Sequence, residues 1–195
     1  MPKISLRQAA LAALILNFGF FFFEFGVARA IGSVSLFADS VDFLEDCAVN
    51  VLLLAALGWG RKARAKAGMA MAALILVPSL ATLWQAISKI WHPQAPDAAW
   101  LSLTGLAAMT VNVCAALILS RHRHTGGSLT RAAFLSARND VLANAAIILA
   151  GAVTATLWHS LWPDLIAGLG IFAMNLDAAR EVWEAAREEH AAINR

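Results

Sequence analysis

The chain has 195 residues, of which 60% are apolar and 14% are charged, and its mean hydropathy is +0.67. A soluble domain carries about 25% charged residues, so this composition leaves too little polar surface for a water-soluble enzyme, and it also excludes intrinsic disorder. The net charge of +2 offers no dense basic field for nucleic acid. Cys47 and Cys114 both lie in apolar stretches, and they form neither a disulfide framework nor a zinc knuckle.

Six apolar runs follow one another along the chain, and each is long enough to cross a bilayer, which needs about 20 residues. The sequence therefore predicts an all-α membrane protein, a six-transmembrane-helix bundle. The predicted helices span about 8–30, 34–59, 69–91, 99–120, 132–158 and 161–183. Short breaks between the runs predict antiparallel neighbours. We expect a membrane domain over 1–183, a short charged cytoplasmic tail over 184–195, and no cytoplasmic C-terminal domain.

The basic residues predict the orientation of this bundle. With the N-terminus inside, the cytoplasmic segments hold most of the Lys and Arg residues, and the outer side holds only Arg29 and Lys89. Such a bias is typical of membrane proteins with positively charged inner loops. Trp91, Trp100 and Trp158 fall at the predicted outer loops, where interfacial aromatic residues are common. We therefore expect both termini in the cytoplasm of a multi-pass protein of the cell membrane, the inner membrane of a bacterium.

The second run carries an unusual number of acidic residues. At 100° per residue, Asp39, Asp42 and Asp46 fall within an arc of about 60°, and Glu45 lies further round the same helix. A charged carboxylate at the centre of a bilayer costs about 2.5–3.5 kcal/mol. This acidic stripe is therefore predicted to face protein or water rather than lipid.

The fifth run adds Asp140, which is predicted to meet Asp42 and Asp46 near the midplane because the two helices run in opposite directions. Asp42 and Asp46 are four residues apart, so both carboxylates lie on one helical face within reach of one cation. Oxygen ligands suit Mg²⁺, Ca²⁺ and Mn²⁺ and, less selectively, Fe²⁺, Co²⁺ or Zn²⁺. No histidine falls inside a predicted span, which argues against a nitrogen-rich site.

Other polar residues within the runs have a simpler interpretation. A single buried acid in a membrane helix can be protonated and hydrogen-bonded to a neighbour, which is the role we expect for Asp39. Glu24 and Asn17 of the first run, and Asn112 of the fourth, are expected to be polar groups that help the helices pack.

The run from Gly32 to Asp46, GSVSLFADSVDFLED, resembles the second-helix signature of the cation diffusion facilitator family. The two ligand positions of that signature match Asp42 and Asp46. The stretch AAFLSARNDVLAN resembles the fifth-helix signature, whose aspartate matches Asp140. This sequence departs from the family at the remaining ligand position, which holds Ser136 in place of His or Asp. From the resemblance, we therefore expect the fourth ligand to be Ser136, Asn139, Asn144 or a water molecule.

The resemblance implies efflux of a divalent metal ion in exchange for protons, and usually a homodimer. The transported ion would be Zn²⁺, Mn²⁺, Fe²⁺, Co²⁺ or Cd²⁺, and no resident cofactor is expected. Two other interpretations remain open from the residues: a non-transporting membrane partner or metal sensor that kept the fold, and a carrier for a monovalent cation. An enzyme is the least favoured class, since the sequence has no nucleophile–base pair and no cofactor motif.

Overall fold

The computed structural model describes residues 5–56, 80–120 and 127–193. Within these ranges every regular element is a helix, so the all-helical fold class is confirmed. The helices are α1 (Leu6–Ile31), α2 (Val34–Ala56), α4 (Ala98–Ser120), α5 (Gly127–Thr156) and α6 (Trp162–Ile193). A further helical stretch covers 80–91, which is the end of the third predicted span, while 69–79 lies outside the described residues.

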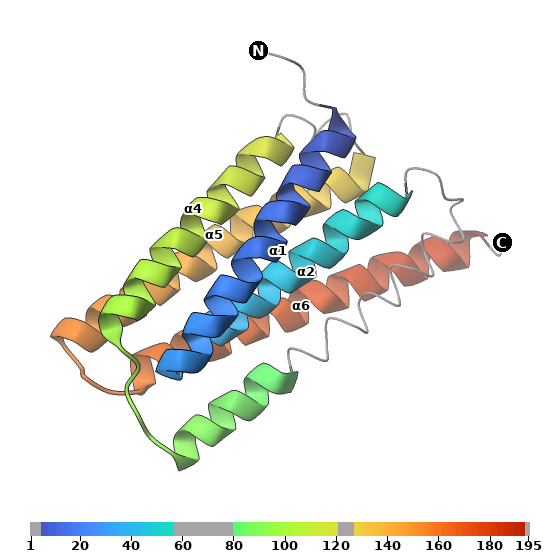
Figure 1. Ribbon diagram of the computed structural model, residues 1–195. Helices are drawn as coiled ribbons and strands as arrows, with labels where there is room; N and C mark the ends of the chain where they lie inside the picture. Colours follow the sequence, from blue (N-terminus) through green and yellow to red (C-terminus); the bar gives the residue numbers. More distant parts are fainter. Residues whose placement is uncertain (1–4, 57–79, 121–126, 194–195) are drawn as a thin grey trace.

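Helix α2 lies at the centre of the bundle. It contacts α1, α5 and α6 along its length, and it touches α4. Helices α4 and α5 pack along each other, and α1 contacts both α4 and α2. Figure 1 shows that the axes of these helices are roughly aligned and that α1 lies between α4 and α2. The acidic residues of α2 therefore meet side chains of several neighbouring helices.

The corner between α1 and α2 consists of Gly32 and Ser33. Gly32 has a φ of 64°, and its N–H donates to the carbonyl of Ala28. This left-handed conformation suits glycine, which has no Cβ to clash with the following carbonyl. Ser33 also donates its N–H to the carbonyl of Ala28, at 3.0 Å. The corner thus turns the chain back within two residues and places α2 antiparallel to α1.

A carboxylate from another helix caps the first turn of α2. Asp164, in the first turn of α6, accepts the backbone N–H groups of Val34 at 2.8 Å and Ser35 at 3.2 Å. The hydroxyl groups of Ser33 and Ser35 also donate to it, each at 2.6 Å. All four residues are fully buried. A helix N-terminus has unpaired N–H groups and a partial positive charge. The Asp164 carboxylate accepts hydrogen bonds from the N–H groups, and its negative charge is attracted by the positive end of the helix.

Close packing and two further hydrogen bonds hold the same corner. A Cβ added to Gly168 of α6 would lie 2.8 Å from the backbone carbon of Val34, so only glycine permits this approach of α6 to α2. Gln85 donates to the carbonyl of Ser33 at 3.0 Å, and Lys89 donates to the carbonyl of Gly32. The corner is therefore tied both to α6 and to the helical stretch 80–91.

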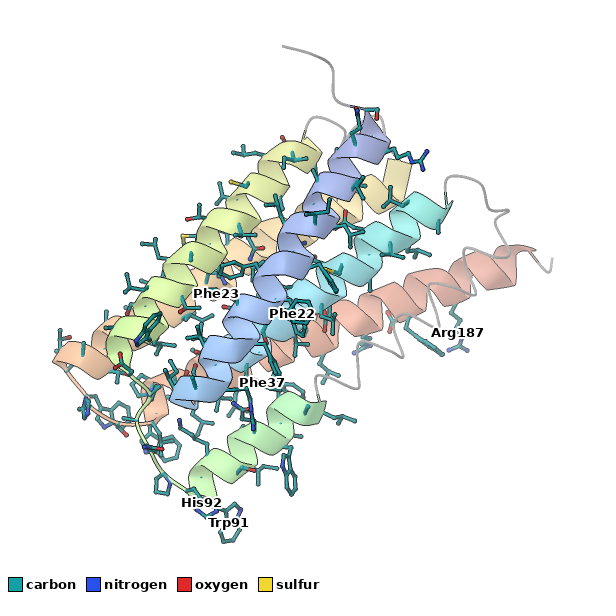
Figure 2. All side chains as sticks on the ribbon, in the orientation of Figure 1. Phe22, Phe23, Phe37, Trp91, His92 and Arg187 are labelled. Carbon is teal, nitrogen blue, oxygen red and sulfur yellow. The ribbon has the colours of Figure 1, made fainter. Side chains whose placement is uncertain are left out.

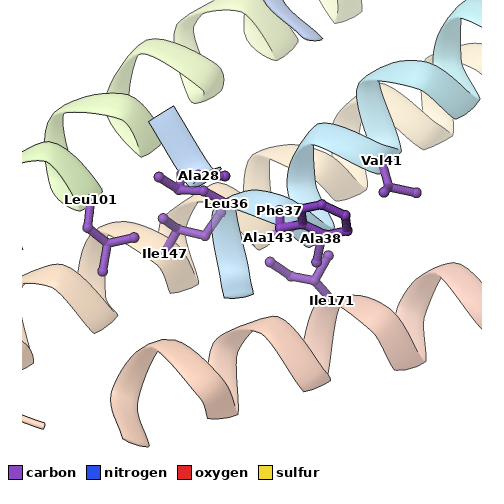
Figure 3. Close-up of a cluster of buried hydrophobic side chains, with 9 residues drawn as sticks. All are labelled: Ala28, Leu36, Phe37, Ala38, Val41, Leu101, Ala143, Ile147 and Ile171. Carbon is purple, nitrogen blue, oxygen red and sulfur yellow. The ribbon is translucent and has the colours of Figure 1, made fainter. Parts of the chain in front are cut away.

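Apolar packing occurs on both sides of a buried polar layer. The larger cluster, shown in Figure 3, lies next to the corner. It consists of Ala28, Leu36, Phe37, Ala38, Val41, Leu101, Ala143, Ile147 and Ile171. The smaller cluster contains Ala13, Ala115 and Leu119. Along α1, Asn17 and Glu24 lie between Ala13 and Ala28 and are themselves buried, so polar side chains occupy the middle of the bundle.

The surface of the bundle is apolar. Leu157 is 83% exposed and Trp91 77% exposed, and Phe22 and Phe23 point away from the bundle on α1 (Figure 2). A water-soluble protein has the opposite arrangement, since large exposed apolar patches are rare there. By length and composition α1 and α4 can each cross a membrane, and α5 contains a shorter apolar stretch, Asp140–Thr156. The spans expected in the rest of the chain, and the cytoplasmic placement of both termini, stay predictions.

Two helices differ in extent from the sequence prediction. Helix α5 begins at Gly127 rather than at 132, because a glycine is tolerated at the start of a helix and no breaker follows it. Helix α6 continues to Ile193, past the predicted membrane span that ends at 183, so the charged tail extends the last helix, as its sequence suggests. An ion pair between Arg180 and Glu184, at 2.8 Å and four residues apart, supports this extension.

Candidate cation site

Helix α2 carries four acidic side chains into the bundle. Asp39 is fully buried, while Asp42 and Asp46 are 6% and 5% exposed. Glu45 is half-buried. Asp42 and Asp46 lie one helical turn apart and share a face. The acidic stripe expected from the sequence thus faces the protein interior.

Helix α5 contributes Asp140, which is half-buried. Its carboxyl group lies within hydrogen-bonding reach of that of Asp46. Asp42 is close enough to Asp140 and Asp46 for the negative charges to repel one another. The three aspartates predicted to converge are therefore electrostatic neighbours on two facing helices. Since α5 begins at Gly127 and not at the predicted 132, Asp140 lies 13 residues, or about 20 Å, from the start of its helix.

These carboxyl groups do not form a closed coordination shell in this conformation. Across 5–56, 80–120 and 127–193, no three His, Cys, Asp or Glu side chains have the arrangement of a metal centre. Binding of one ion by Asp42, Asp46 and Asp140 would therefore draw their oxygens inward. Ser136 and Asn139 lie on the backbone of α5, but their side chains fall outside the described ones, and their roles as ligands stay predictions.

Asn144 lies with Asp39 rather than among the three aspartates. Its amide nitrogen donates to Asp39 Oδ2, and its Oδ1 accepts a hydrogen bond from Asn112 Nδ2 at 3.2 Å. Asn144 is fully buried, and Asn112 is 1% exposed. For Asn144 to act as a metal ligand, as the sequence prediction allows, its oxygen would first have to leave Asn112.

Asn17 of α1 is a direct neighbour of the candidate site. Its Nδ2 donates to Asp46 Oδ2 at 3.0 Å, and the side chain is 1% exposed. Its Oδ1 has no hydrogen-bond partner. The sequence indicated only that Asn17 is a polar residue in an apolar helix; that α1 brings it to Asp46 is a result of the tertiary fold. Asn50, four residues after Asp46, instead donates to the backbone carbonyl of Asp46 at 2.8 Å.

Asp164 was not anticipated as an important residue. It had no role in the sequence analysis, where it lies beside Pro163 at the start of the sixth predicted helix. The one available signal was the pair of serines at the start of the second run, Ser33 and Ser35, which need a buried acceptor if that end lies inside the protein.

An apolar exterior and a buried layer of carboxyl and amide groups are typical of an integral membrane protein with a functional polar interior. Residues 10–188 match the model of the cation efflux transmembrane domain. The chain belongs to this cation efflux family, and the resemblance to cation diffusion facilitators is thereby confirmed. Members of the family are membrane transporters of cations, not enzymes.

Two relatives come from Mycobacterium tuberculosis, strains CDC 1551 / Oshkosh and ATCC 25618 / H37Rv, and both bear the name "probable cation efflux system protein". Each is 28% identical to this chain over 197 residues, covering 93% of this chain and 57% of the relative. The chain thus spans a little more than half the length of these curated relatives.

Proposed function

We propose that this protein exports a divalent metal ion across the membrane in exchange for protons, and that Asp42, Asp46 and Asp140 bind the ion. The observation that carries the proposal is the proximity of these three acids on α2 and α5 within the bundle. Three carboxylates in one buried place repel one another unless a cation or protons neutralise them. A mobile cation supplies that charge.

Exchange follows from competition for the same oxygens. A carboxylate must lose its proton before it binds a metal ion, so metal and protons displace each other. If the site opens to one side at a time, metal enters from the cytoplasm and protons from outside. The net result is metal export driven by proton entry. We place the protein in the inner membrane of a bacterium, with both termini in the cytoplasm, as a homodimer.

Metal flux into vesicles tests the proposal. Purified protein is reconstituted with a proton gradient and offered Mn²⁺, Fe²⁺, Co²⁺, Zn²⁺ or Cd²⁺ in turn. We expect uptake of at least one ion that stops when a protonophore collapses the gradient. Because the proposed ligands are oxygens, we expect less preference for Zn²⁺ than a histidine-containing site has.

The same vesicles separate the alternatives. Metal binding without gradient-dependent flux would contradict the proposal and favour a sensor or partner subunit. Competition by Na⁺ or K⁺ at concentrations similar to those of the divalent ions would instead favour a monovalent carrier.

Ser136 provides a second test, because it lies four residues before Asp140 on α5. Ser136→Asp adds a carboxylate at the position where the family has its fourth ligand. We expect zinc affinity, measured by isothermal titration calorimetry, to rise by about tenfold or more, since even residues that only support a metal ligand change affinity by about 10–100-fold. Ser128→Asp, also on α5, is the control. Unchanged affinity in Ser136→Asp would contradict the proposed position of α5 in the site.

A further inference from the structure

Glu24 of α1 and Asp39 of α2 are two acids that the proposed metal site does not use. Both side chains are 0% exposed. They lie together where α1 packs against α2, close enough for the carboxyl groups to repel each other when charged. From the sequence we expected each to be a packing residue, and a packing residue should have hydrogen-bond partners.

Most oxygens of this pair have no partner. Asp39 Oδ2 accepts the hydrogen bond from Asn144, whereas Asp39 Oδ1 has no donor. Neither Oε1 nor Oε2 of Glu24 accepts a hydrogen bond from a donor group, and the carboxyl group lies close enough to that of Asp39 for the two to share a proton or a cation. An unpaired buried carboxylate is costly, because nothing replaces the water it loses. Several such oxygens at one place therefore indicate a missing ligand.

Basic side chains in the described part of the chain do not supply the counter-charge. The one ion pair among these residues joins Arg180 to Glu184, near the far end of α6. Lys89 donates to the carbonyl of Gly32 at the corner, and Arg29, the nearest basic residue along α1, is exposed. Within the described residues, a proton or a cation from solution is therefore the remaining source of the neutralising charge.

The surroundings hold Asp39 in place for this role. Asn112 donates to Asn144, which in turn donates to Asp39, so a chain of two amides orients the carboxyl group and leaves Oδ1 free. Asp39 precedes Asp42 by about one turn, or roughly 4.5 Å along the helix. Residues of the larger apolar cluster, among them Ala38 and Val41, flank Asp39 along the helix. The pair thus lies next to both the three aspartates and that cluster.

We propose that Glu24 and Asp39 form a second site for a divalent cation, built from oxygen ligands and separate from the Asp42–Asp46–Asp140 site. Carboxylate oxygens suit hard divalent ions such as Mn²⁺, which complete their coordination with water or amide oxygens. The ion neutralises both acids and occupies the free oxygens. Because the site is defined by the contacts of Glu24 and Asp39, its occupancy by a cation can be measured by equilibrium binding, without any transport.

Equilibrium Mn²⁺ binding tests the second site, with the full chain in detergent and free Mn²⁺ measured by electron paramagnetic resonance. We expect the wild-type chain to bind about two ions, and Glu24→Gln and Asp39→Asn to bind about one each, because each neutral amide removes a charged ligand. Asp46→Ala should keep about one ion, bound by Glu24 and Asp39. Glu184→Gln changes an exposed acid in the same way and should bind as the wild type does.

Wild-type stoichiometry and affinity in both Glu24→Gln and Asp39→Asn would overturn the proposal and make the pair a protonated packing contact. Loss of all Mn²⁺ binding in Asp46→Ala would overturn it as well, because the two sites would then be one. Failure of the proposed function gives a different result, namely unchanged binding in Asp46→Ala. Both amide variants keep the shape of the side chain, and thermal unfolding confirms that each is folded before binding is measured.

Discussion

Asp46→Ala and Asp140→Ala are each expected to lower metal flux into vesicles by more than about 100-fold, since loss of even a hydrogen-bonded neighbour of a metal ligand costs about 10–100-fold. The two acids lie on facing helices within hydrogen-bonding reach of each other, so each variant removes one side of the proposed site. Flux is measured with the ion that the wild-type protein transports best, at a fixed proton gradient.

Two controls make this result specific to the site. Glu184→Gln removes an exposed acid of α6 and should transport as the wild type does. Gel filtration in detergent shows whether the alanine variants keep the same particle size as the wild type. Metal-dependent flux at wild-type rates in both Asp46→Ala and Asp140→Ala would refute the assignment of the metal site.

Asp164→Ala is expected to lower the free energy of unfolding by about 3–5 kcal/mol, the range found when one partner of a buried charged contact is removed. Its carboxylate accepts the backbone N–H groups of Val34 and Ser35 and the hydroxyl groups of Ser33 and Ser35. Without it the two buried N–H groups have no acceptor, and the two hydroxyl groups keep only their 3.4 Å contact with each other. Each unsatisfied donor costs about 1–3 kcal/mol. Thermal unfolding in detergent, followed by circular dichroism, measures the loss.

Asp97→Ala is the matched control, because Asp97 also caps a helix. It accepts the N–H groups of Ala99 and Trp100 at 3.0 Å each, but at an exposed end of α4. There water replaces the lost carboxylate, so we expect a cost of about 1 kcal/mol. Equal destabilisation in the two variants would contradict the view that burial makes the Asp164 contact strong.

The sequence by itself determined the class of fold and the positions of the candidate ligands along the chain. Composition required an apolar exterior, and the period of the helix placed Asp42 and Asp46 on one face. The ends of the helices were less accurate: α5 begins before 132 and α6 continues past 183. Where no proline or capping residue stops a helix, the local sequence determines the position of its end only weakly.

Only the tertiary structure decided which polar groups meet. Asn17 donates to Asp46 across 29 positions of sequence, Asn144 to Asp39 across 105, and Val34 to Asp164 across 130. Helical periodicity gives the face on which a side chain lies, but not the neighbouring helix that this face contacts. That choice depends on how all the helices pack together, and close approaches such as that at Gly168 determine it.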